Sequence, residues 1–151
     1  MEIWLIQLIT ATLGAFAFSL IFNVRGKMVL FTTLGGLVAW GSYLLLKIAG
    51  FTPVTGYFFV SIFITIYAEI NARVQKAPAT VFLVCAIIPL VPGSRLYATM
   101  VHAVHQNWSG FMEKGLETLM LAMALAGGII FISTIMHAMH AAREIRQQHK
   151  R

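Results

Sequence analysis

The chain has 151 residues, of which 59% are hydrophobic and 11% are charged, with a formal net charge of +6. This composition excludes an ordinary soluble domain and is typical of an integral membrane protein. The basic residues flank apolar runs, as the positive-inside rule requires, so the net charge does not indicate nucleic-acid binding. A lone cysteine, Cys85, excludes an internal disulfide. We therefore expect one all-α, polytopic transmembrane domain over residues 1–151.

The first two expected spans, residues 3–22 and 28–46, carry stripes of small residues. These stripes place a small residue at every fourth position, as in Ala11, Ala15 and Ser19, then Thr32 and Gly36, and Gly35 and Ala39. Small side chains let membrane helices approach closely. We expect helix contacts there, within the chain or between subunits.

The third expected span, residues 54–72, has a small and polar face made of Ser61, Thr65, Ala68 and Ala72. Glu69 lies beside that face, and Arg73 follows four residues later. This order favours an ion pair along the helix. The alternative is that Glu69 couples protons or binds an amino group, and the sequence favours the ion pair.

The fourth expected span, residues 78–105, is longer than the about 20 residues that a helix needs to cross a bilayer. Pro89 and Pro92 interrupt it, because each lacks a backbone N–H and clashes with the preceding turn. Gly93 can adopt a positive φ, and Ser94 is a suitable N-cap for a second half-helix. Such a break is either architectural or a binding site, since broken helices bind substrate in many transporters.

Arg95 is the sharpest candidate for a ligand contact. A charge at membrane depth is costly, and it faces a cavity or a partner in most proteins. The guanidinium matches a carboxylate, and the start of a half-helix also favours an anion. The alternatives are a side chain that reaches toward the lipid headgroups or a pair with a neighbouring subunit. The candidate substrate-binding residues are Pro89, Pro92, Gly93, Ser94, Arg95 and Tyr97, and Glu69 and His102 are candidate coupling residues.

A polar turn is expected at residues 106–110, before a fifth span at 115–136 and a basic cytoplasmic tail at 137–151. Glu113 and Glu117 then lie near the N-terminus of the fifth span, where the helix dipole favours acidic residues. If residues 78–105 cross the membrane fully, the basic residues of the loops and tail all lie on one side of the membrane, except for Lys47 and Lys114 on the other side. We therefore expect five spans, with the N-terminus outside and the C-terminus in the cytoplasm.

Enzymatic chemistry has little support in this sequence. There is no phosphate-binding loop, nucleophile elbow or zinc motif. His102 and His105 share a helix face, but no cysteine or carboxylate nearby completes a metal site. We expect no enzyme activity, no metal and no cofactor.

The sequence resembles the small membrane subunit of the split threonine/serine exporter family. The resemblance rests on Phe22-Asn23-Val24, on the glycine-rich second span, on Ala77-Pro78, and above all on Ile88-Pro89-Leu90-Val91-Pro92-Gly93, followed by Tyr97 and Met100. It implies a larger YjjP-like membrane subunit as partner, and hence a hetero-oligomer in the bacterial inner membrane. It also implies export of small carboxylate-bearing metabolites, either threonine and serine or dicarboxylates such as succinate.

Two classes of function follow. The first is a transport subunit, which the broken span favours. The second is a non-transporting membrane scaffold that stabilises a partner protein, although a scaffold gains little from an interrupted span.

Overall fold

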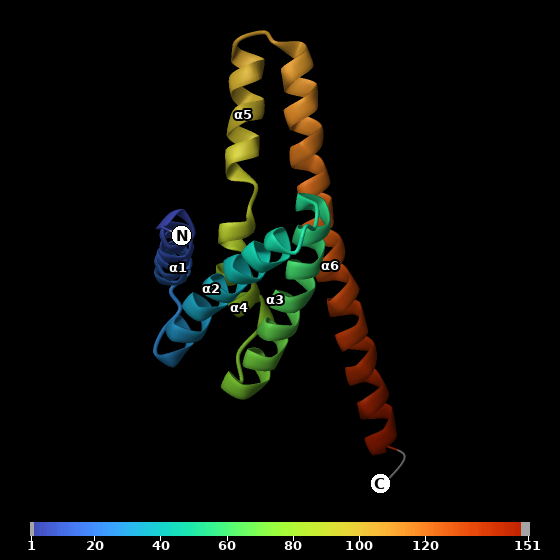
Figure 1. The fold of residues 1–151 in the computed structure, drawn as a ribbon. Helices are drawn as coiled ribbons and strands as arrows, with labels where there is room; N and C mark the ends of the chain where they lie inside the picture. Colours follow the sequence, from blue (N-terminus) through green and yellow to red (C-terminus); the bar gives the residue numbers. More distant parts are fainter. Residues whose placement is uncertain (1, 149–151) are drawn as a thin grey trace.

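The computed structural model describes the backbone of residues 2–148 and the side chains of residues 3–139. Within these residues the chain is helical throughout (Figure 1). In order, the elements are α1 (Glu2–Ile21), α2 (Lys27–Ile48), α3 (Pro53–Gln75), α4 (Ala79–Ile87), the 3-10 helix η1 (Ile88–Leu90), α5 (Gly93–Val104) and α6 (Trp108–Gln148).

The spans expected from hydropathy are confirmed. Four helical stretches are long and apolar enough to cross a membrane, namely Ile3–Ile21, Lys27–Ile48, Pro53–Gln75 and Trp108–Met139. The pair Ala79–Leu90 and Gly93–Val104, bent by 54°, makes a fifth if it counts as one broken span. The described residues therefore form an all-α, polytopic membrane fold.

The distribution of side chains is that of a protein surrounded by lipid. Large apolar residues such as Leu13, Phe63 and Ile130 are exposed, whereas Ser19 and Thr32 are fully buried. Since lipid offers no hydrophobic penalty to exposed apolar groups, small and polar residues occupy the helix contacts instead.

Helix α2 lies between α1 on one side and α4 on the other. A Cβ atom added at Gly36 would overlap the Cβ of Ala15 in α1. One added at Gly35 would lie 2.8 Å from the Cβ of Ala86 in α4. The hydroxyls of Ser19 and Thr32 form a 2.7 Å hydrogen bond across the α1–α2 contact. The small-residue stripes therefore pack helices within the chain.

Helix α6 begins before the start of the expected last span. We expected a polar turn at residues 106–110 and a span from residue 115, but α6 begins at Trp108. The physical reason is the side chain of Asn107, whose Oδ1 accepts a hydrogen bond of 3.1 Å from the backbone N–H of Gly110. This arrangement caps the first turn of a helix and brings its start forward. The helix also continues through the expected tail to Gln148, while residues 149–151 lie outside the described residues.

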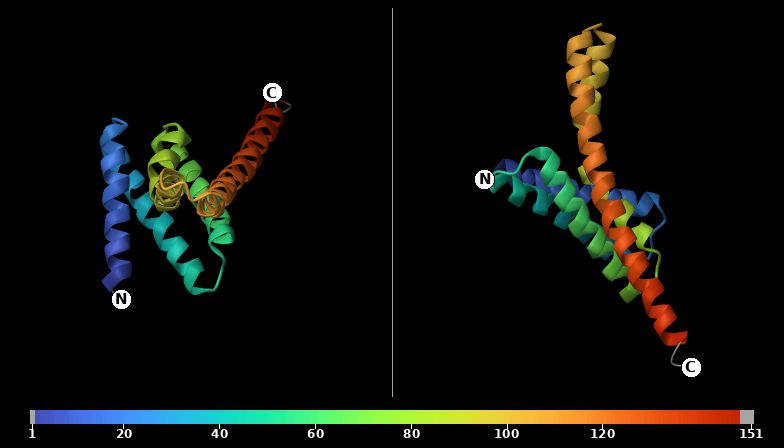
Figure 2. Two further views of the ribbon diagram at one scale, coloured as in Figure 1. Left: turned by 90° about the horizontal axis from the view of Figure 1, so that it is seen from above. Right: turned by 90° about the vertical axis from the view of Figure 1, so that its right-hand side faces the viewer.

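A hairpin of α5 and the first half of α6 stands clear of the other helices. Figures 1 and 2 show these two helices side by side, joined at the top of the view and pointing away from α1, α2 and α3. The second half of α6 descends beside α3, so α6 joins the hairpin to the rest of the fold.

We predict that Gly36→Ala destabilises the protein by about 1–3 kcal/mol, because the new methyl group forces α1 and α2 apart. Gly14→Ala is the matched control, since a Cβ at Gly14 meets no atom within 4 Å. That control should be neutral, or more stable by up to about 1 kcal/mol through helix propensity. Thermal unfolding of both variants in detergent, followed by tryptophan fluorescence, measures the difference. Equal stabilities would show that the contact tolerates a methyl group.

Candidate functional site

The break in the fourth span is built from two prolines. After α4 ends at Ile87, Pro89 occupies the first turn of η1, and Val91 donates a 3.1 Å hydrogen bond to the carbonyl of Ile88. Gly93 then donates a 2.7 Å hydrogen bond to Val91 before α5 begins. The expected break at these residues is confirmed, and it turns the chain by 54°.

Two details of the expected half-helix are wrong. The position before α5 is Pro92, which provides no capping side chain, so Ser94 is a helical residue and not the N-cap. Gly93 is absent from the glycines of positive φ, and a Cβ atom there would meet nothing within 4 Å. The fixed φ of Pro92 suits the position before the helix, so the turn is made without a left-handed residue.

A shallow cavity of about 230 Å³, open to the surface, lies beside the break. Its lining comes from α1, α2 and η1, namely Gln7, Thr10, Ala11, Trp40 and Pro89. The indole Nε1 of Trp40 is buried and has no hydrogen-bond acceptor among the described residues. The backbone at Pro89 therefore borders a small space with polar groups on the α1 side.

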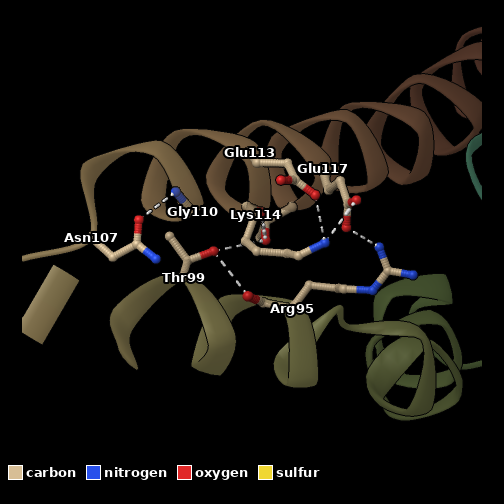
Figure 3. A network of polar contacts seen from close by, with 8 residues as sticks. Arg95, Thr99, Asn107, Gly110, Glu113, Lys114 and Glu117 are labelled. Atoms are coloured by element: carbon tan, nitrogen blue, oxygen red, sulfur yellow. Dashed lines mark hydrogen bonds and ion pairs between the residues drawn. The ribbon is translucent and has the colours of Figure 1, made fainter. Parts of the chain in front are cut away.

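Arg95 is already paired within the chain. Its Nη1 contacts Oε2 of Glu117 in α6, and the two side chains are 40% and 36% exposed (Figure 3). Glu117 also accepts a 3.2 Å hydrogen bond from Nζ of Lys114, which lies 3.0 Å from Glu113. The four charges sum to zero. The pairing of Arg95 was expected only as an alternative, and with a neighbouring subunit rather than with α6.

The acidic residues of α6 have a different role from the one expected. Because α6 begins at Trp108, Glu113 and Glu117 lie beyond its first turn, where the helix dipole is weak. Both pair with cations of the hairpin instead. The sequence did contain a signal for this, because Arg95 and Glu117 stand at equal separations from Gln106, where the chain reverses.

The remaining candidate residues are spread over the fold. Pro89 lies on the cavity, whereas the side chain of Tyr97 is 71% exposed. His102 packs against Gly110 near the end of the hairpin, where a Cβ at Gly110 would lie 2.5 Å from its ring Nδ1. Glu69 belongs to another part of the molecule, on α3. The expected set of residues therefore does not converge on one pocket.

The expected ion pair on α3 is confirmed. Oε2 of Glu69 lies 3.9 Å from Nη2 of Arg73, one helical turn away. Among the described residues, no group of three histidine, cysteine, aspartate or glutamate side chains is arranged to hold a metal ion.

We predict that the Arg95–Glu117 pair stabilises the hairpin only weakly, because solvent screens a partly exposed ion pair. A double-mutant cycle with Arg95→Gln and Glu117→Gln measures this coupling energy through unfolding in detergent. Glu113→Gln provides the control partner, because Glu113 contacts Lys114 and not Arg95. A coupling energy near zero would mean that the contact contributes nothing to stability.

Comparison with known proteins assigns the chain to a family, whereas no solved structure matches it. Residues 7–135 match the family described as Threonine/Serine exporter, ThrE. The matched region covers most of the chain and includes the break, both prolines and the Arg95–Glu117 pair. The chain therefore belongs to the threonine/serine exporter family.

Proposed function

We propose that the chain is a membrane subunit of a two-component exporter of small hydrophilic metabolites that carry a carboxylate. The candidates are threonine and serine, or dicarboxylates such as succinate. The observation that carries the proposal is the broken span beside a cavity, within a chain of an exporter family. Irregular backbone in a membrane is tolerated where it is buried in protein or borders a water-filled space.

The proposed path of the solute follows the break. Pro89, Pro92 and Gly93 leave backbone groups outside regular helix, and the cavity beside Pro89 offers room for a small molecule. In this proposal α5 moves during transport and carries Ser94, Arg95 and Tyr97 with it. Arg95 is available to a solute carboxylate when its contact with Glu117 opens, and the two carboxylates then compete for one guanidinium.

We infer a larger membrane subunit as the partner in a hetero-oligomer. The hairpin of α5 and α6 exposes apolar side chains on both helices, among them Met100, Val104, Met112 and Leu116. A single chain with few spans also encloses little space for a permeating solute. The scaffold alternative requires a partner as well, and it differs because it assigns no role to the break.

The proposed orientation places the N-terminus outside and the C-terminus in the cytoplasm. Arg25, Lys27, Arg73 and Lys76 then share the cytoplasmic side with the basic tail. Helix α6 has 41 residues and extends about 60 Å, twice the hydrocarbon thickness of a bilayer, so part of it lies outside the hydrocarbon layer.

The orientation predicts the activity of reporters fused after Arg151. A reporter that works only in the cytoplasm should be active there, and one that works only outside should be inactive, because an odd number of spans separates the termini. Fusions in the loop between α2 and α3, at Gly50, should give the opposite pattern if α1 and α2 both cross. An active external reporter at the C-terminus would reject the five-span topology.

The transport proposal predicts that Pro89→Ala combined with Pro92→Ala abolishes export, because both changes restore backbone donors and allow a continuous helix. Efflux of preloaded threonine or serine from cells, normalised to the amount of protein in the membrane, measures the effect. Pro53→Ala is the control, since Pro53 stands in the first turn of α3 and interrupts nothing. Normal efflux by the double variant would remove the break from the transport path and favour the scaffold.

A further inference from the structure

A second cavity, of about 270 Å³, lies between α3, α4 and α6. Five of the residues that line it carry polar side chains, namely Thr65, Glu69, Thr80, Ser133 and His137. They come from three helices that are distant in sequence, so the cavity is a product of the fold. Neither the break nor the Arg95–Glu117 pair contributes to it.

Glu69 supplies the cavity with a carboxylate that has few partners. Its side chain is only 17% exposed, and Arg73 is 3.9 Å away, too far for a normal hydrogen bond. No hydrogen bond to the Glu69 carboxylate exists among residues 3–139. A carboxylate held in a membrane protein with so little compensation is a candidate functional site.

The first turn of α4 also borders the cavity. Pro78 precedes α4 and provides no capping side chain, so the first N–H groups of α4, at Ala79 and Thr80, meet no side-chain acceptor. Pro78, Ala79 and Thr80 all line the same cavity as Glu69. Glu69 and the first turn of α4 therefore border one small space.

Hydroxyl and imidazole groups complete the lining. Ser133 and His137 lie one turn apart on α6, on the face of that helix toward the cavity. The hydroxyl of Thr65 is already committed to the carbonyl of Ser61, at 2.6 Å. Ser133, like Thr80 and His137, makes no side-chain hydrogen bond among the described residues, so its hydroxyl can exchange hydrogen bonds with a ligand hydroxyl.

We propose that this cavity is a binding site for a small zwitterionic α-amino acid, with its ammonium group on Glu69, its carboxylate at the start of α4 and its side-chain hydroxyl on Ser133. The site rests on the proposed exporter function. It also distinguishes between the two solute classes, because a dicarboxylate would place a second negative charge against Glu69.

The two cavities lie at opposite ends of α4. The site at Glu69 borders the first turn of α4, and the cavity at Pro89 follows its last turn, about 13 Å further along the helix. Arg73 in the last turn of α3 and Lys76 just after that helix lie before α4, at the end that is cytoplasmic in the proposed orientation. The zwitterion site is therefore where a solute would first be captured before it reaches the break.

Binding of radiolabelled L-serine to inside-out membrane vesicles from cells that express the full chain tests the proposal. Vesicles from cells without the chain give the background. Unlabelled 3-hydroxypropionate, which lacks the ammonium group, ethanolamine, which lacks the carboxylate, and succinate should each compete about tenfold or more weakly than L-serine. L-Threonine should compete comparably.

Substitutions identify which residue meets which group. Glu69→Gln should weaken L-serine binding by about tenfold or more and abolish the preference over 3-hydroxypropionate. Ser133→Ala should weaken L-serine and leave L-alanine unchanged. Thr134→Val is the matched control, because Thr134 is the exposed neighbour of Ser133 on α6, and it should change neither affinity.

Arg73→Gln separates a ligand role of Glu69 from a purely structural ion pair. If Glu69 binds the ammonium group, removal of Arg73 leaves L-serine binding intact or tighter, because a competitor is lost. If the pair only stabilises α3, Arg73→Gln and Glu69→Gln lower binding equally, through a lower amount of folded protein. An equal loss of binding in these two variants would overturn the proposal. So would an unchanged preference of Glu69→Gln for L-serine over 3-hydroxypropionate, or a lack of L-serine binding by the original chain.

Efflux from the same cells distinguishes failure of the site from failure of the exporter function. If export depends on the chain but Glu69→Gln binds L-serine as well as the original protein does, the proposed site is wrong and the exporter function stands. Specific binding with no export that depends on the chain leaves the site standing and overturns the exporter function.

Discussion

Close approach of helices at glycine is the constraint on which the rest of this structure depends. In lipid, helices gain nothing by hiding apolar side chains from their surroundings, so van der Waals contact and a few hydrogen bonds hold them together. Contact of that kind needs small residues. Gly36 against Ala15, Gly35 against Ala86, and Gly128 against Ser61 supply it at three separate helix pairs. At Gly128 an added Cβ would lie 2.7 Å from the backbone carbonyl of Phe58, so α3 and α6 meet nearly backbone to backbone.

These contacts also place both cavities. Gly35 and Gly36 are neighbours on α2, and they hold α4 and α1 on different sides of that helix. A Cβ at Gly36 would lie 3.6 Å from Cγ of Pro89, so the same glycine brings η1 close to α1. The cavity at the break therefore lies where two close helix contacts meet. The contact at Gly128 likewise holds α6 against α3, and Ser133 and Glu69 line one cavity between these helices.

The sequence predicted what depends on local pattern and missed what depends on pairing in space. Spans, small-residue stripes, the break and the Glu69–Arg73 pair all follow from periodicity or from spacing within one helix. The Arg95–Glu117 contact depends on the hairpin, and the start of α6 depends on how Asn107 bonds to its neighbours. Glu69 was identified, but its neighbours Thr80 and Ser133 lie on other helices. No pattern along the chain indicates that these three residues share a cavity.

The two charged residues that the sequence singled out differ in how far the fold satisfies them. Arg95 is the rarer feature in an apolar run, yet it meets Glu117 within a cluster of balanced charge. Glu69 is the more ordinary feature, since an acid four residues before an arginine has a ready structural explanation. Its contact with that arginine is nevertheless long, and its side chain is the more buried of the two. A charge that a fold leaves under-compensated is stabilised by water, by a ligand or by a partner, or is lost through protonation. The proposal of a ligand at Glu69 therefore rests on its incomplete pairing and not on its rarity in the sequence.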